Sequence, residues 1–527
     1  MHPVEEVLGL LVAVALLTVA ARRLGIPYPI LMTLGGVALG LIPGLPRVEL
    51  APDIVFTLIL PPLLFAAAFF TSPRELAANA RPIGLLAIGL VLATTILVAV
   101  VVHALAPGVP WAVAFLLGAI VSPPDAVAAT SIAQRLGLPR RVVTILEGES
   151  LVNDATALVA YRLALVAVLT GTFSLGGAAL SFVVVSVGGV AVGFIAGWAI
   201  IAVISRLDDP PVEVLISLLG PFAAWLPAEA AHVSGVLSVV TAGIMVGRHA
   251  PRILGSDARV LGSGAWQMVI FTLNGMVFIL IGLQLPTILD TLSASRSFGE
   301  LASWAVVVSL TVILVRLVWV FPGTWLPRML SPAIRARERA PVTRNVLIVG
   351  WAGMRGVVSL AAALAIPNTL PDKVTPFPDR DLLIFLTFSV ILATLVGQGL
   401  TLPLLIRWLG VGDDGTAAHE ELHAREAAVN AALARLEGLA TEWPGHLELI
   451  DRLRERKQHA TEHFEHDHEA GEVPLDQEAV EHAAIQRAVI DAQRMAIIDL
   501  RDRGVIGDQA LRRIERELDL EELGAEA

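Results

Sequence analysis

The stretch ILEGESLVNDATAL, residues 145–158, is the most informative part of this sequence. It lies within an apolar run from Val142 to about Thr170, which is long enough to cross a lipid bilayer. The run nevertheless holds three carboxylates beside a serine and an asparagine, namely Glu147, Glu149, Ser150, Asn153 and Asp154. An ionisable side chain at bilayer depth costs at least ~2.5–3.5 kcal/mol on insertion, so its presence predicts a functional site.

Helical geometry arranges these polar residues in two stripes. At 100° per residue, Ser150 and Asp154 share one face, with Glu147 a further turn back, while Glu149 and Asn153 share the next face. Asp154 lies about 12 residues into the helix, or roughly 18 Å, which is near the middle of the membrane. A soluble helix or a headgroup boundary would also hold these carboxylates, but apolar spans on both sides argue against that alternative.

The composition is that of a polytopic membrane protein. Hydrophobic residues make up 55% of the chain and charged residues only 16%, against roughly 25% in soluble proteins. The mean hydropathy is +0.74. A formal charge of −11, without a basic cluster among aromatics, argues against nucleic-acid binding. The absence of cysteine excludes disulfides, thiolate metal sites and cysteine nucleophiles, and no cofactor is expected.

Apolar stretches of roughly 17 to 25 residues predict about thirteen transmembrane helices. They lie near 5–21, 27–43, 54–71, 82–106, 110–133, 142–170, 175–205, 211–227, 232–248, 263–285, 300–321, 344–367 and 380–409. With the N-terminus outside, the inward loops carry 16 arginines and the outward loops only four basic residues. The positive-inside rule therefore favours an outer N-terminus and a cytoplasmic tail. We expect the first run, Val7–Ala20, to be a retained span, because no basic region precedes it.

Two of these spans are interrupted at corresponding places. Ser122-Pro123-Pro124 breaks the fifth, and Gly350, Gly353 and Gly356 break the twelfth, seven spans later. Paired broken helices in two halves of a chain are the best sequence indicator of a transporter binding site. Spans one to six would then match spans eight to thirteen in inverted orientation, with the seventh as linker. The alternative is that these prolines and glycines merely kink packed helices.

Four motifs carry a resemblance to a known family. They are the string ESLVND at 149–154, SPPDAV at 122–127, Arg316 within LVRLVW, and GMRG at 353–356. Together they resemble the monovalent cation:proton antiporter-1 family, the NhaP- and NHE-like sodium/proton exchangers. The motifs occur in the family's order, and the resemblance covers residues from about 5 to 410. The tail after 410 lies outside it.

The resemblance implies an arrangement of domains. Residues 1–410 would form the transmembrane antiporter domain, with two inverted repeats whose broken helices cross. Its core would comprise the spans at about 82–170 and 300–409. A scaffold that forms a homodimer would comprise the spans at about 5–71 and 175–285. Residues 411–527 would form a cytoplasmic helical tail.

Asp154 is the predicted site of exchange. A carboxylate is a hard oxygen ligand for a small cation and also a titratable base. If it holds either a proton or a sodium ion, and moves only when loaded, each cycle exchanges one for the other. Asn153 stands where electrogenic relatives carry a second aspartate, so the resemblance implies electroneutral one-for-one exchange.

The resemblance also implies the other ligands. Asp125 would help to form the cation site together with Ser150, so that Na⁺ is bound by Asp154, Asp125 and Ser150. Two departures from the family pattern affect this site. Pro124 precedes Asp125 where members often have threonine, which leaves a carbonyl but no hydroxyl, and Ala66 replaces an acid that many relatives carry in span three.

The remaining buried charges are assigned structural roles. Glu149 and Arg316 would form an ion pair, as the matching residues do in the family, because either charge alone would be costly to bury. Arg355 would offset the helix-end carbonyls of the broken twelfth span and repel a second cation. Arg162 is predicted to snorkel to the membrane surface, and Glu147 to attract cations at the cytoplasmic entrance.

The tail differs from the rest of the chain. Residues 415–527 are rich in Ala, Glu and Arg and are broken by glycines and prolines, which predicts several amphipathic helices in water. Four histidines, His459, His463, His466 and His468, make metal or proton sensing conceivable. A solvated polar helix is the favoured account of them.

The sequence therefore predicts a plasma-membrane Na⁺/H⁺ antiporter, with Li⁺ and K⁺ as further candidate cations, that serves pH homeostasis. A K⁺/H⁺ antiporter of the same family is the main alternative. A cation channel is a remote one, because nothing resembles a carbonyl filter. An intramembrane hydrolase with Ser150 as nucleophile is another, but no GxSxG string surrounds this serine, so no enzyme activity is expected.

Overall fold

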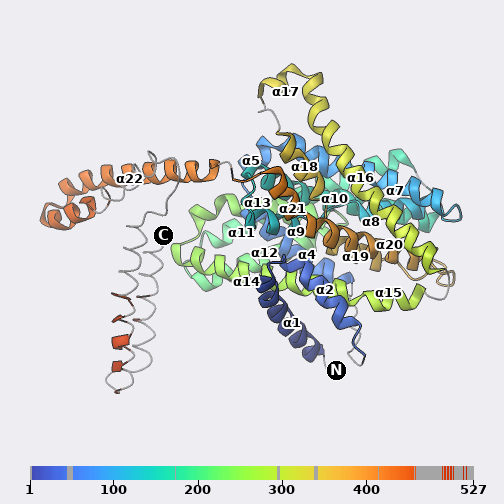
Figure 1. The fold of residues 1–527 in the computed structure, drawn as a ribbon. Coiled ribbons are helices and arrows are strands. Elements are labelled where there is room, and N and C mark those ends of the chain that lie inside the picture. Colours follow the sequence, from blue (N-terminus) through green and yellow to red (C-terminus); the bar gives the residue numbers. More distant parts are fainter. Residues whose placement is uncertain are drawn as a thin grey trace. The chain divides into compact units, whose positions relative to one another are not determined.

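The chain forms two compact units in this computed structural model, Met1–Asp414 and Gly415–Ala527. The structure describes residues 3–43, 52–172, 174–292, 297–337, 342–413 and 415–455, and scattered residues between 457 and 518. Figure 1 shows the first unit as a bundle of helices. Within the described residues the only strand-like pairing is an isolated antiparallel bridge between Thr369 and Pro376. The predicted all-helical class is confirmed.

The first half of the bundle contains the following helices, in which η marks a π-helical segment. They are α1 (Pro3–Leu24), α2 (Tyr28–Gly40), α3 (Pro52–Ile54), η1 (Val55–Ile59), α4 (Leu60–Phe70), α5 (Pro73–Ala78), α6 (Ala80–Gly84), η2 (Leu85–Leu90), α7 (Val91–Leu105), α8 (Trp111–Val121), α9 (Ala126–Arg135) and α10 (Arg140–Thr170).

The second half follows the same style of long helices joined by short turns. It contains α11 (Leu175–Ile204), α12 (Pro210–Ala230), α13 (Gly235–Ile253), α14 (Ser256–Leu283), α15 (Leu285–Leu292), α16 (Phe298–Leu330), α17 (Pro332–Arg337), α18 (Thr343–Trp351), α19 (Val357–Leu364), α20 (Arg380–Leu392), η3 (Ala393–Gln398) and α21 (Gly399–Leu409).

Nine helical stretches of the described residues are long and apolar enough to cross a membrane, which confirms a multi-pass protein. Two shorter apolar helices, α2 and α8, fall on the predicted second and fifth spans. The outer face of α11 exposes large apolar side chains such as Leu180, Phe194 and Trp198, as expected of a surface in contact with lipid. The count of thirteen spans stays a prediction.

Close helix packing relies on small residues, as is usual in membranes. At Gly36 of α2, an added Cβ would lie 2.2 Å from the carbonyl oxygen of Ile279 in α14. At Gly282 of α14, it would lie 2.2 Å from the carbonyl oxygen of Thr33 in α2. The two helices therefore touch backbone to backbone, and neither glycine tolerates a side chain without separating them.

Two helices are broken where the sequence predicts. The first break separates α8 from α9 at residues 122–125, because Pro123 and Pro124 lack the N–H that a continuing helix needs. The second separates α18 from α19 at residues 352–356. The breaks touch: the backbone N–H of Asp125 donates to the carbonyl of Met354, with an N to O distance of 2.6 Å. The inverted-repeat relation between the two halves stays a prediction.

Helix α10, which carries the polar stripes, packs against both broken helices. It contacts α8, α9, α18 and α19, and on other sides α4, α7, α11 and α13. Its C-terminus is closed by Gly171 in the left-handed conformation, with φ of 69°. The polar residues of α10 are thus placed next to the two breaks.

The second unit begins with one long helix, α22 (Thr416–Glu442), followed by η4 (Pro444–His446), which unlike η1 to η3 is a single 3₁₀ turn. Within it, Arg435 donates two hydrogen bonds to Glu442, at 2.7 and 3.1 Å. The helix ends just before the predicted break at Pro444-Gly445, so the described part of the tail is helical as predicted. The four tail histidines lie outside the described residues.

Candidate cation site where two broken helices meet

A buried arginine occupies the meeting point of the two breaks. Arg355 is 0% exposed, and its Nε donates to the carbonyl of Val121 at 3.1 Å. Its Nη2 donates to the carbonyl of Ser122 at 3.3 Å, and its Nη1 donates to the carbonyl of Gly353. Its backbone N–H donates to Oγ1 of Thr394 at 3.0 Å. The guanidinium thus satisfies carbonyls that the end of α8 leaves without helical partners and offsets their partial negative charge.

Asp125 lies against the second break from the other side. Its Oδ1 accepts a hydrogen bond from the backbone N–H of Val127 at 2.8 Å, which fixes the carboxylate at the start of α9. Its Oδ2 lies so close to Gly356 that a Cβ added there would be 1.7 Å away. Only glycine therefore allows the carboxylate of Asp125 to occupy this position.

Substitution of Gly356 tests this contact. We expect Gly356→Ala to displace the Asp125 carboxylate and to lower the rate of cation exchange roughly tenfold or more, because overpacking costs about 1–3 kcal/mol. Gly397→Ala is the matched control, since an added Cβ there meets nothing within 4 Å. The measurement is exchange activity in proteoliposomes at equal protein density. Equal activity of both variants would contradict the contact.

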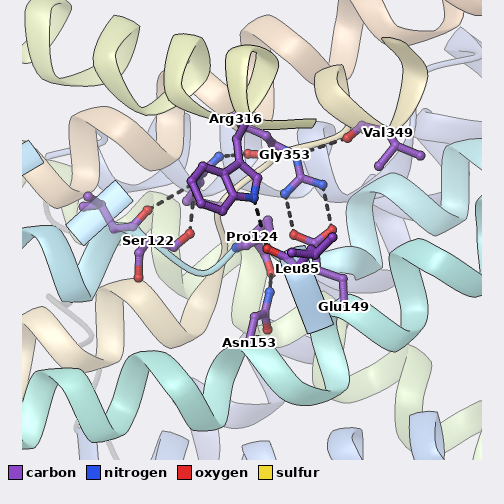
Figure 2. A network of polar contacts seen from close by, with 11 residues as sticks. Leu85, Ser122, Pro124, Glu149, Asn153, Arg316, Val349 and Gly353 are labelled. Carbon is purple, nitrogen blue, oxygen red and sulfur yellow. Dashed lines mark hydrogen bonds and ion pairs between the residues drawn. The ribbon is translucent and has the colours of Figure 1, made fainter. Parts of the chain in front are cut away.

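The two key residues of α10 lie next to Asp125. Asn153 is fully buried, and its Nδ2 donates to the carbonyl of Pro124 at 2.9 Å (Figure 2). Its Oδ1 is buried without a hydrogen-bond partner among the described residues. Asp154 is 6% exposed and lies near enough to Asp125 for the two carboxylates to interact electrostatically. Ser150, one turn earlier, is half-buried.

This arrangement gathers oxygen atoms suited to a small cation. The carboxylate of Asp125 and the buried amide of Asn153 lie at the first break, and α10 also carries the carboxylate of Asp154 and the half-buried hydroxyl of Ser150. The carbonyl oxygen of Pro124 accepts a hydrogen bond from Asn153, and a carbonyl oxygen has two lone pairs. Ala66 is 1% exposed and packs in an apolar cluster with Phe65 and Leu151, so it brings no charge to the site.

Glu149 and Arg316 form a bidentate ion pair. The Nη1 to Oε1 distance is 2.5 Å and the Nη2 to Oε2 distance is 2.7 Å, and both side chains are at most 1% exposed. The Nε of Arg316 also donates to the carbonyl of Val349 at 3.1 Å. Figure 2 shows the two parallel contacts between the guanidinium and the carboxylate. The pair joins α10, α16 and α18 at the level of the second break.

Two features of the surroundings were not anticipated. Arg162, predicted to snorkel, is exposed, and its Nη2 donates to both carboxylate oxygens of Glu229 in α12, at 2.9 and 3.1 Å, a partner that the sequence did not indicate. Thr394 accepts from the backbone of Arg355 and so supports the second break. The sequence signal for Glu229 was its position as a single acid near the end of an apolar span. The sequence did not single out Thr394, because hydroxyl residues are common inside membrane helices.

Paired broken helices in contact, with buried carboxylates and a compensating arginine at the contact, are the architecture of a secondary transporter. The family model described as "Sodium/hydrogen exchanger, transmembrane" matches residues 9–408. This chain belongs to the sodium/hydrogen exchanger family, which is a family of antiporters.

Relatives and a solved structure agree with this assignment. The chain is 35% identical over 527 residues to an uncharacterised Na⁺/H⁺ exchanger of Mycobacterium tuberculosis, covering 98% of this chain and 96% of that protein. It is 36% identical over 392 residues to a sodium, potassium, lithium and rubidium/H⁺ antiporter of Bacillus pumilus, covering 72% and 58%. The sodium proton antiporter MjNhaP1 of Methanocaldococcus jannaschii has the same fold, with a TM-score of 0.61, 20% identity and coverage of 77% and 98%.

Proposed function

We propose that this protein exchanges Na⁺ for H⁺ across the plasma membrane as a secondary antiporter, and that it is not an enzyme. The observation that carries the proposal is the gathering of Asp125, Asp154 and Asn153 at the contact of two broken helices. The names of the relatives support the class of substrate. The Bacillus relative is named for potassium, lithium and rubidium as well, so K⁺/H⁺ exchange is the second candidate.

The proposed mechanism is competition for one carboxylate. Asp154 binds either a proton or the cation, and Asp125 with Ser150 supplies further oxygen ligands. The Oδ1 of Asn153, which has no hydrogen-bond partner in the part of the chain that the structure describes, would be a further neutral ligand. Because Asn153 carries no charge, one proton leaves for each cation that binds, and the exchange is electroneutral. The positive charge of Arg355 beside the site disfavours a second cation.

Alternating access would move a core against a scaffold. The core would comprise α6 to α10 and α16 to α21, and the scaffold α1 to α4 and α11 to α14. The smaller cluster of buried apolar residues, drawn mainly from α4, α11, α12 and α13, supports a scaffold with its own packing. The scaffold would also form the homodimer, with the N-terminus outside and the tail in the cytoplasm.

A cavity supports the proposed alternation of the spans across the membrane. Arg22, Arg135 and Arg407 line one cavity, although they come from the ends of the predicted first, fifth and thirteenth spans. The charge pattern of the loops predicts that these three ends lie on the cytoplasmic side. Their gathering at one place is what that topology requires.

The direct test uses purified protein in liposomes that contain a pH-sensitive dye. Adding Na⁺, Li⁺ or K⁺ outside should produce proton efflux without a change in membrane potential. If the liposomes contain unlabelled Na⁺, labelled Na⁺ added outside should accumulate inside in exchange for it. This accumulation would distinguish an exchanger from a channel. Proton flux that appears only when a potential is imposed would contradict electroneutral exchange.

The ion pair between Arg162 and Glu229 makes a second prediction about this motion. It joins the proposed core helix α10 to the proposed scaffold helix α12, in the wall of a cavity of about 340 Å³ that Asp53 also lines. Relative movement of core and scaffold must break it. A partly exposed pair contributes at most about 1 kcal/mol, so Arg162→Gln or Glu229→Gln should change the Na⁺ concentration for half-maximal exchange by up to about fivefold.

The control for this prediction exchanges the two charges. The double variant Arg162→Glu with Glu229→Arg keeps the pair and should return towards the wild-type value. Single variants that match the wild type, or a double variant whose change equals the sum of the single changes, would show that the pair has no part in the motion.

A further inference from the structure

A second cavity lies at the ends of several helices, and one of its lining residues, Tyr28, lies near enough to Asp125 for the two side chains to interact electrostatically. The cavity has a volume of about 490 Å³ and is bounded by the end of α1, the turn from α1 to α2, the end of α9, and α21. Three arginines line it, Arg22 from α1, Arg135 from α9 and Arg407 from α21. They are far apart in the sequence, so the fold alone brings them together.

The charges around this cavity are unbalanced. Among the residues that the structure describes, none that lines it carries a carboxylate. Among the described residues, the guanidiniums of Arg22 and Arg407 have no hydrogen-bond or ion-pair partner. Arg135 is held in place, because its Nη1 donates to the carbonyl of Gly25 at 3.1 Å, which leaves its other N–H groups available. Tyr28 also lines the cavity. All three arginines are exposed residues, and among the described residues no acidic side chain of the lining compensates their charge.

Such a cavity would repel the cations that the protein transports. Three guanidiniums around one space are instead suited to an anion with several acceptor oxygens, and phosphate oxygens match the planar fork of arginine. The volume exceeds that of a single inorganic phosphate and leaves room for a small group attached to it.

We infer that this cavity binds a phosphate group, either free phosphate or the phosphodiester headgroup of an anionic lipid. The inference goes beyond the proposed exchange function. A bound phosphate would connect α1 to α9 and α21 through Arg22, Arg135 and Arg407, and would therefore stabilise the arrangement described here relative to any other.

Thermal unfolding of the full-length protein in a neutral detergent and sodium-free buffer tests the inference. One series adds inorganic phosphate as its choline salt, with choline chloride at equal ionic strength as the reference. A second series adds short-chain phosphatidylglycerol, with short-chain phosphatidylcholine as reference. We expect a saturable rise of the unfolding midpoint in at least one series. A higher unfolding midpoint with inorganic phosphate identifies a site for free phosphate. A higher midpoint with phosphatidylglycerol alone identifies a lipid headgroup site.

Arginine variants localise the effect. Arg22→Gln and Arg407→Gln should each raise the half-maximal concentration of the probe roughly tenfold, because each removes charge-assisted hydrogen bonds. Arg23→Gln is the matched control, since Arg23 is the exposed neighbour of Arg22 and does not line the cavity. The inference is overturned if neither probe stabilises the wild type, or if Arg23→Gln weakens the effect as much as Arg22→Gln. This readout is independent of transport, so its failure leaves the exchange proposal untouched.

Discussion

Replacing Asp154 with asparagine should lower Na⁺-driven proton transport to the rate of protein-free liposomes. The amide has nearly the volume of the carboxylate and keeps an oxygen, but it neither binds a proton at physiological pH nor carries the charge that attracts a cation. Because Asp154 is buried beside Asp125, the loss of one negative charge should not unfold the protein. The measurement is dye-monitored exchange in proteoliposomes, together with the thermal unfolding midpoint of the same preparation.

Two observations decide how this result is understood. Asp257→Asn makes the same chemical change at an exposed position in the first turn of α14, and should leave exchange unchanged. Robust Na⁺-dependent proton flux in Asp154→Asn would end the assignment of Asp154 as the exchange site. A lost unfolding transition in this variant would instead show that the carboxylate supports the fold.

Glu149→Gln should reduce stability far more than it changes ion selectivity. Removing one partner of a buried ion pair leaves the other charge uncompensated, at a cost of about 3–5 kcal/mol. Arg316 is fully buried and donates to two oxygens of Glu149, so this cost applies to the remaining guanidinium. We expect a low yield of folded protein and an unfolding midpoint that is lower by many degrees.

The control removes both charges. The double variant Glu149→Gln with Arg316→Met leaves no uncompensated charge, and it should recover much of the lost stability, because neutral replacements of buried pairs are often tolerated. A well-folded Glu149→Gln protein with altered Na⁺ affinity would contradict the structural role and place Glu149 in the cation pathway.

The features that the sequence predicts well are those with a local physical cause. The helix break at residues 122–125 follows from two consecutive prolines, which cannot donate the hydrogen bonds of a helix. The contact between Glu149 and Arg316 follows from the cost of burying either charge alone, together with the family resemblance. In both cases a few residues were enough for the prediction, because any other arrangement would leave these prolines or buried charges in an unfavourable environment.

The features that the sequence does not predict depend on contacts between distant segments. The approach of Asp125 to Gly356 requires the two breaks to be docked in one orientation, and neither residue specifies that orientation alone. The partner of Arg162 lies 67 residues away in another helix. The π-helical segments η1, η2 and η3 lie within predicted spans, but their residues are as apolar as those of ordinary membrane helices.

The roles of Asp125, Asn153 and Asp154 as cation ligands stay predictions. The geometry places Asp125 and Asn153 at the first break, and Asp154 on the same helix as Asn153. A position next to an unwound segment is necessary for a transport site, but only measured transport assigns the role. The variants at Gly356, Asp154 and Glu149 separate positioning, ion exchange and folding from one another.

The most direct test of competition at one carboxylate is the pH dependence of Na⁺ affinity. In wild-type proteoliposomes with equal pH on both sides, labelled Na⁺ exchange is measured over a range of Na⁺ concentrations at successive pH values. If Na⁺ must displace a proton from the site, the half-maximal Na⁺ concentration should rise by about tenfold for each pH unit below the pKa of the site. The maximal rate should stay constant. A half-maximal concentration that does not change with pH, while the maximal rate falls, would contradict a shared carboxylate.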